Sequence, residues 1–306
     1  MSERNSNQGA STRSASIMML LATVCVAASF PVSKSLMQYA SAELALLLRF
    51  VISSVLFYMF ILLRGLSAPV IPKKWRMYVF VSFFYAMFFI CTFEALKLTS
   101  PFNTSVIYTL MPSVSLFLSW LIYKDLNIKH YVIPLIISTL VSVIVVSGGK
   151  LSFIEIIDAA NLGDVIFLFG TICMACFFNV TKKYTANESP LISTFYILLG
   201  NTIWMSLYLF LSSEEVYFNV NIASVFELLF LVLFCTVFTF FSVQYSAKKI
   251  DSMKISSFSY LMPVFVVLMN LLFFSIEVDF VIVLSSLISV LSLFYIQWVS
   301  GVKSSL

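Results

Sequence analysis

Residues 27–34 read AASFPVSK, and residues 175–182, 148 positions later, read ACFFNVTK. The two stretches share Ala, Phe, Val, a hydroxyl residue and Lys in the same order. A second pair follows, because Leu-Met-Pro at 110–112 returns at 261–263, and an acidic residue comes after each copy, Asp125 and Glu277. Three matches in one order at nearly one offset predict that the chain is a duplication of a single unit.

The composition places both units in a membrane. Of the 306 residues, 61% are hydrophobic and 10% are charged, whereas soluble domains have about 45–50% and about 25%. Ten apolar stretches are each long enough to cross a bilayer as a helix, and they lack the alternating pattern of a membrane barrel. We therefore predict ten transmembrane helices. The stretches are Ile17–Ser33, Leu44–Leu63 (with Arg49), Met77–Phe93, Leu98–Tyr123, Tyr131–Gly149, Val165–Thr181, Ser189–Ser213, Leu228–Ala247, Ile255–Ile276 and Phe280–Val302.

The basic residues predict the orientation of these helices. Fourteen of the 18 Lys and Arg residues fall in the N-terminus, the even-numbered loops and the C-terminus, and only Lys97 and Lys150 fall in odd-numbered loops. Because basic loops stay on the cytoplasmic side, both termini are predicted to be cytoplasmic.

Five helices per unit is an odd number, so the second unit must enter the membrane from the opposite side. The predicted fold is an all-α polytopic membrane protein of ten transmembrane helices, arranged as two inverted five-helix repeats. The predicted segments are a polar, disordered cytoplasmic tail (1–16), a first repeat (17–149), a periplasmic linker (150–164), a second repeat (165–302) and a cytoplasmic C-terminus (303–306).

The sequence resembles the EamA type of drug/metabolite transporter. The resemblance covers roughly residues 17–300 and departs from the family at two places: the Trp-Gly of the first helix is missing, and Lys124-Asp125 replaces the Gly-Glu that closes the fourth. The residues that carry it are Phe30, Pro31 and Lys34 at the end of the first helix, Arg49 in the second, Ala95-Leu96 through Pro112 to Asp125, Tyr245 through Pro263 to Glu277, and Gly163-Asp164.

Ionisable groups inside a membrane are costly and indicate a functional site. Arg49 lies roughly 9 Å inside the second helix, counting about 1.5 Å per residue. Lys34 and Glu94 approach the same outer side from the first and third helices. One interpretation is a polar gate or a receptor for an anionic group, and the other is a structural Arg–Glu pair beside a Lys that extends to the interface.

Further candidates come from prolines and from polar or aromatic residues within the spans. Pro31, Pro112 and Pro263 are predicted hinges, although a static kink is the alternative for each. The candidate cavity walls, any of which can instead be a packing or interface residue, are Asn103, Tyr108, Asn179, Trp204, Gln244, Tyr245 and Tyr260.

The predicted function is secondary transport of small organic metabolites across a bacterial inner (plasma) membrane by alternating access. The resemblance implies export of amino acids or related amphipathic solutes, and a coupling ion is left open. The alternatives are import of a nucleotide-like or cationic metabolite, a membrane-embedded lipid-modifying enzyme, or a small channel or assembly factor. The sequence has no HExxH, P-loop or dinucleotide motif, so no metal or cofactor is predicted. The basic loops are explained by membrane orientation and the 32 Phe residues by contact with lipid, so no nucleic-acid partner is predicted.

Overall fold

The computed structural model describes residues 2–66, 74–123, 161–185, 188–250 and 252–273, with a few single positions between 132 and 295. The predicted spans Tyr131–Gly149 and Phe280–Val302 fall outside these ranges, as do Asp125 and Glu277.

The described ranges are almost entirely helical. The only β pairing among them is an isolated bridge between Ala40 and Phe218. The α-helices are α1 (Ser2–Leu36), α2 (Ala42–Leu63), α3 (Trp75–Leu98), α4 (Pro101–Tyr108), α5 (Met111–Tyr123), α8 (Leu162–Thr185), α9 (Pro190–Leu211), α10 (Ile222–Val232), α11 (Thr239–Ala247), α12 (Ser252–Ser257) and α13 (Met262–Phe273). A π-helix, Leu233–Phe238, joins α10 to α11, and a short 3₁₀ turn, Phe258–Leu261, joins α12 to α13.

Within the described part of the chain, seven helical segments are long and apolar enough to cross a membrane. They are Thr12–Leu36, Ala42–Leu63, Trp75–Leu98, Pro101–Leu121, Leu162–Thr185, Pro190–Leu211 and Ile222–Ala247. A shorter apolar helical stretch, Lys254–Met269, overlaps the predicted ninth span. The protein is therefore an all-helical, multi-pass membrane protein.

Residues 1–16 are predicted to be a disordered tail, but in the structure α1 already begins at Ser2. Two hydrogen bonds hold its first part against α11. The Ser14 hydroxyl lies 3.2 Å from the Tyr245 hydroxyl, and the Ser246 hydroxyl donates to the Ala15 carbonyl at 3.1 Å. These contacts give the polar segment partners that the sequence pattern does not reveal.

The predicted fourth and ninth spans each contain a break that ends at the Leu of the repeated Leu-Met-Pro, just before Met-Pro. The fourth divides at Thr109–Leu110, between α4 and α5. The ninth changes to 3₁₀ geometry over Phe258–Leu261, before α13 begins. Proline lacks an N–H and crowds the preceding turn, which favours such a break on its N-terminal side.

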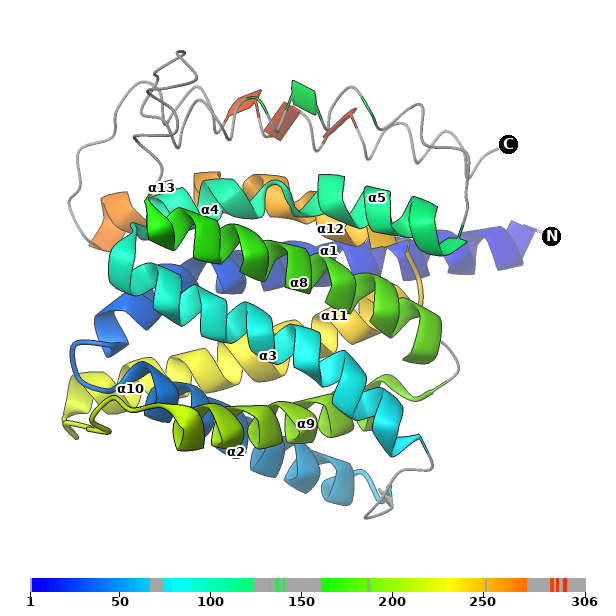
Figure 1. Cartoon of the computed structure of the whole chain (residues 1–306). Coiled ribbons are helices and arrows are strands. Elements are labelled where there is room, and N and C mark those ends of the chain that lie inside the picture. Colours follow the sequence, from blue (N-terminus) through cyan, green and yellow to red (C-terminus); the bar gives the residue numbers. More distant parts are fainter. Residues whose placement is uncertain are drawn as a thin grey trace.

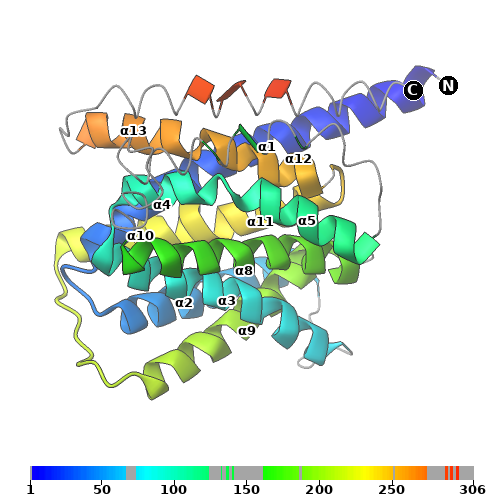
Figure 2. The same cartoon turned by 45° about the horizontal axis from the view of Figure 1, so that its top comes forward.

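Packing between the two predicted halves follows one pattern twice. Helix α1 packs against α11 and α13, and α8 packs in the same way against α3 and α5, while α2 packs against α9. Figure 1 shows α2 and α9 together at the bottom of the bundle, with α3, α11 and α8 above them, and Figure 2 shows α1 beside α13 at the top. Helices α3 and α8 pack closely, since a Cβ added at Gly170 of α8 would lie 2.8 Å from the Cβ of Cys91 in α3.

Two ends of the bundle are used as landmarks below. At the Ser41 end, where α1 turns into α2, the loop between α9 and α10 is held by backbone bonds from Ser41 N to Tyr217 O (3.0 Å) and from Asn219 N to Tyr39 O (2.7 Å). At the opposite end, which we call the Lys74 end, α2 leads to α3 and α8 leads to α9.

Candidate functional site

The site is organised by the π-helix between α10 and α11. A π turn widens the helix and displaces the usual backbone pairing, and such turns often occur at functional sites. Here the Thr236 hydroxyl donates to the Leu231 carbonyl at 2.9 Å, five residues back. The Cys235 carbonyl accepts from the Thr239 hydroxyl at 2.8 Å. The widened segment thus presents acceptor oxygens to a side chain from another helix.

Arg49 of α2 is that side chain. Its Nε donates to the Thr236 hydroxyl at 2.6 Å, and its Nη2 donates to the Cys235 carbonyl at 3.0 Å. The guanidinium carbon lies 4.5 Å from the centre of the Phe89 ring. Arg49 is only 1% exposed, and all these partners are neutral. Among the described residues no carboxylate pairs with Arg49, and its Nη1 makes no hydrogen bond.

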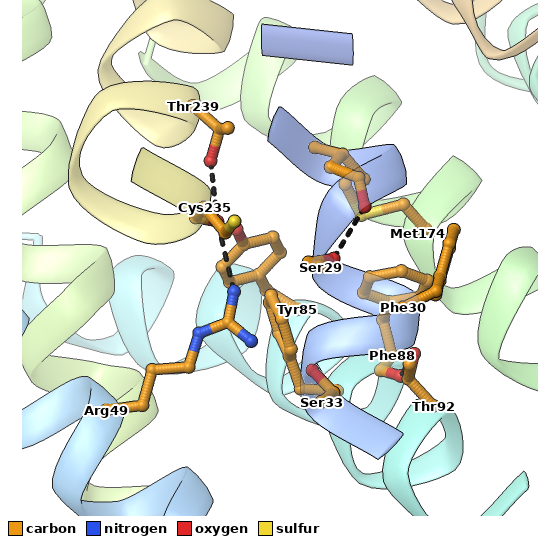
Figure 3. Close-up of a pocket in the computed structure, with 12 residues that line it drawn as sticks. Ser29, Phe30, Ser33, Arg49, Tyr85, Phe88, Thr92, Met174, Cys235 and Thr239 are labelled. Carbon is orange, nitrogen blue, oxygen red and sulfur yellow. Dashed lines mark hydrogen bonds between the residues drawn. The ribbon is translucent and has the colours of Figure 1, made fainter. Parts of the chain in front are cut away.

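A cavity, here called the Arg49 cavity, adjoins this guanidinium. Figure 3 shows Arg49 reaching from α2 toward the π-helix, with Tyr85 and the α1 serines across the space from it. The lining is mostly apolar, and the cavity has room for about one or two water molecules. The lining residues are Val26, Ser29, Phe30, Ser33, Arg49, Tyr85, Phe88, Phe89, Thr92, Met174, Cys235 and Thr239.

A second cavity, here called the Met111 cavity, lies where the two broken helices meet α1 and α8. It too is mostly apolar and small. Val26 of α1 and Met174 of α8 line both cavities, so the two spaces adjoin at these side chains. The lining residues of the Met111 cavity are Met19, Ala22, Thr23, Val26, Tyr108, Met111, Met174, Phe178, Val243, Ile255, Phe258, Ser259 and Met262.

Lys34 and Glu94, predicted to act with Arg49, lie at the Ser41 end and bind other groups. Lys34 Nζ donates to the Thr99 carbonyl at 2.7 Å. Glu94 forms an ion pair with Lys97 at 2.9 Å and accepts from the Tyr208 hydroxyl at 2.5 Å. Arg49 and Glu94 therefore do not pair, and of the three residues only Arg49 lines either of the two cavities described above.

The predicted wall residues lie in different surroundings. Tyr108 lines the Met111 cavity and is 4% exposed. Asn179 instead joins α8 to α5, because its Nδ2 donates to the Ser115 hydroxyl at 3.0 Å and its Oδ1 accepts from the Ser119 hydroxyl at 2.6 Å. Trp204 Nε1 donates to the Val79 carbonyl at 3.2 Å, which joins α9 to α3.

The remaining wall candidates lie outside the linings of both cavities. Tyr245 bonds to Ser14 and Lys249 near the Lys74 end. Gln244 and Tyr260 are almost fully buried, and the Nε2 of Gln244 has no partner among the described residues. Asn103 lies in the first turn of α4, where its N–H donates to the Ser100 hydroxyl at 3.0 Å and caps the helix.

The three predicted hinge prolines are all in helices. Pro31 is buried within α1. Pro112 and Pro263 are each the second residue of the helix after a break, α5 and α13, next to Met111 and Met262 of the Met111 cavity. Bending at either break would therefore change that cavity.

Several lining residues were not among the sequence candidates. Ser29 and Ser33 are four residues apart on α1, so they share one face with Val26 and Phe30. Small hydroxyl residues repeated at this spacing in an apolar span are a recognisable signal for a polar lining. Glu227 was also missed, because α10 begins at Ile222, before the predicted span. It accepts from the Ser35 hydroxyl at 2.7 Å.

A polar cluster at the Lys74 end involves Glu188. Lys74 Nζ lies 3.3 Å from its carboxylate, and the Tyr78 hydroxyl also donates to it. Partial burial lowers the pKa of Lys248 nearby, partly offset by the charge of Glu188. No group of three potential metal ligands occurs among the described residues.

Comparison with known proteins explains this architecture. A family model described as "EamA-like transporter family" matches residues 13–148 and again residues 161–298. The chain belongs to the EamA-like transporter family. Arg49 and the linings of both cavities lie within the matched ranges.

Two individual proteins agree with this membership. The chain is 25% identical over 255 residues to the "Uncharacterized transporter YyaM" of Bacillus subtilis (strain 168), covering 81% of this chain and 82% of that protein. It also shares the fold of a protein of known crystal structure, with a TM-score of 0.72 at 14% identity, over 94% of this chain and 97% of the other. The protein is thus a membrane transporter.

Proposed function

We propose that this EamA-like protein is a secondary transporter that moves small organic metabolites across the bacterial inner membrane by alternating access. The observation that carries the proposal is the pair of adjoining cavities, which meet at Val26 and Met174. Opening one cavity at a time to its own side of the membrane would carry a solute across without a continuous pore.

We propose that alternating access depends on an inverted repeat of five helices per half, ten in all. Its support lies in contacts that recur at the repeat offset. Val26 and Met174 are 148 positions apart, and so are Ser54 and Thr202, whose hydroxyls lie 3.1 Å from each other. The Thr23 bond to the Met19 carbonyl has its counterpart, again 148 positions later, in the bond from Thr171 to the Phe167 carbonyl.

The cavity linings follow the same relation. Phe30 lines the Arg49 cavity, and its counterpart Phe178 lines the Met111 cavity. An exchange of this kind is expected if a two-fold axis in the membrane plane passes near Val26 and Met174. Rocking the halves about that axis would close one cavity as it opens the other.

The breaks before Pro112 and Pro263 are the proposed hinges for this motion. Each leaves backbone in a non-α turn beside the Met111 cavity, where a modest change in backbone angles would move a lining methionine. The proposed direction is export of amphipathic solutes, with both termini in the cytoplasm as the basic loops predict.

The test is counterflow in proteoliposomes with labelled amino acids and organic acids as candidate solutes. Val26→Trp fills the junction between the cavities and should lower exchange by about tenfold or more, since overpacking costs about 1–3 kcal/mol. The matched control is Leu21→Trp, on the same helix but 49% exposed. It should exchange like the wild type. Equal exchange by both variants, or lipid turnover without exchange of any solute, would overturn the proposal.

A further inference from the structure

The charge of Arg49 is not balanced within the described part of the protein. The carboxylates of the described membrane-spanning segments bind other groups: Glu43 accepts from Ser212 at 3.1 Å, Glu94 pairs with Lys97 at 2.9 Å, Glu227 accepts from Ser35 at 2.7 Å, and Asp164 accepts from Thr99 at 2.7 Å. A buried cation with neutral partners only is costly, and in a membrane such a group usually faces a ligand pathway.

The guanidinium is held in one orientation with donors to spare. Thr236 and Cys235 fix its Nε and Nη2, and Phe89 covers its face. Figure 3 shows the other terminal nitrogen directed toward the space between Tyr85 and Ser33. A planar guanidinium with free N–H groups is matched to the two oxygens of a carboxylate.

Ser33 provides a second donor at the same cavity. Its side chain is 1% exposed and lines the Arg49 cavity, yet its hydroxyl has no hydrogen-bond partner among the described residues. The hydroxyls of Ser29, Thr92 and Thr239 differ, because each already donates to a backbone carbonyl three or four residues earlier in the chain. The Tyr85 hydroxyl, which lines the same cavity, also has no hydrogen-bond partner among the described residues, so Ser33 and Tyr85 are the two lining hydroxyls available to donate to a ligand.

The other lining residues indicate the chemistry of the rest of the solute, apart from its anionic group. Phe30, Phe88 and Met174 provide an apolar and aromatic wall. Neither cavity is lined by a carboxylate, so an ammonium group on the solute would meet no opposite charge. This arrangement favours a simple organic anion over a zwitterionic amino acid.

We infer that Arg49 and Ser33 form a binding site for the carboxylate of an amphipathic organic monoanion, whose apolar body packs against the aromatic wall. The inference rests on the proposed transport function and names its substrate class. It also revises the expectation of amino acids, because the site has no partner for an α-ammonium group.

The test measures binding to the detergent-purified full-length protein by calorimetry and thermal shift. The probes are phenylacetate, its uncharged analogue phenylacetamide, the zwitterion L-phenylalanine, and sodium sulfate as a plain anion. Phenylacetate should bind and raise the Tm by mass action, while the other three should bind at least about tenfold more weakly.

The variants assign the binding to the site. Arg49→Gln should weaken phenylacetate binding by about 10- to 100-fold, as expected for loss of a bond to a charged group, and Ser33→Ala should weaken it by about 2- to 5-fold. Arg49→Lys keeps the charge and should bind with intermediate affinity. Lys183→Gln removes an exposed positive charge near the end of α8 and should bind like the wild type.

The outcomes separate this inference from the transport proposal. Equal binding of phenylacetate and phenylacetamide, tighter binding of L-phenylalanine, or unchanged binding by folded Arg49→Gln and Ser33→Ala would overturn the carboxylate site. Counterflow that is sensitive to Val26→Trp would still support transport in that case. If Arg49→Gln does not fold, Ser33→Ala and Arg49→Lys decide the result.

Discussion

Arg49 and Asn179 are both fully buried polar residues inside the membrane-spanning bundle, but their hydrogen bonding differs. Asn179 donates to the Ala175 carbonyl at 2.9 Å and to Ser115 at 3.0 Å, and it accepts from Ser119 at 2.6 Å. Arg49 has more donors and keeps some of them unused beside a cavity. A buried polar group whose donors and acceptors are all bonded holds helices together. A buried charged group with unused donors beside a cavity is a candidate ligand-binding group.

The largest effect should come from Arg49→Gln. Counterflow of organic monoanions should fall by about 10- to 100-fold, because the charged hydrogen bond to the solute is lost. The Tm of the ligand-free protein should stay the same or rise, since an unpaired buried charge is removed. A large fall in Tm, with transport lost only in proportion to the folded protein, would make Arg49 a structural residue like Asn179.

Asn179→Leu should lower the Tm and leave transport unchanged, the opposite of the effects expected for Arg49→Gln. It removes the bonds between α8 and α5, and such bonds in membrane bundles contribute about 0.6 kcal/mol on average and up to about 1.7 kcal/mol. The Tm should therefore fall by a few degrees, while exchange per folded molecule stays near that of the wild type. A change in solute affinity without a change in Tm would place Asn179 in the substrate path.

The smallest effect should come from Glu94→Gln at the Ser41 end. Glu94 is part of a half-exposed cluster with Lys97, and exposed ion pairs contribute about 0–1 kcal/mol. Solute affinity should change by less than about twofold, because Glu94 lines neither cavity. A tenfold or larger change in affinity would instead support a gate formed by Glu94 and Arg49 together.

Sequence patterns predicted the helical membrane fold, and Arg49 as a site residue, because apolar length and an intramembrane charge are local signals. They placed Pro112 and Pro263 in the spans that break. They did not reveal the π-helix at Leu233–Phe238, where no Pro or Gly marks the change in winding. Nor did they distinguish Asn179 from a cavity wall, because its bonding depends on Ser115 and Ser119 of another helix.

The central claim, alternating access across the Val26–Met174 junction, is tested most directly by thiol labelling from each side of the membrane. Ser33→Cys reports on the Arg49 cavity and Ser259→Cys on the Met111 cavity. Each is introduced into a variant that lacks the five native cysteines and retains counterflow. With an impermeant maleimide, the two thiols should be labelled from opposite sides, and a transported solute should raise one rate while lowering the other. Labelling of both thiols from the same side, or rates that rise together, would contradict the account.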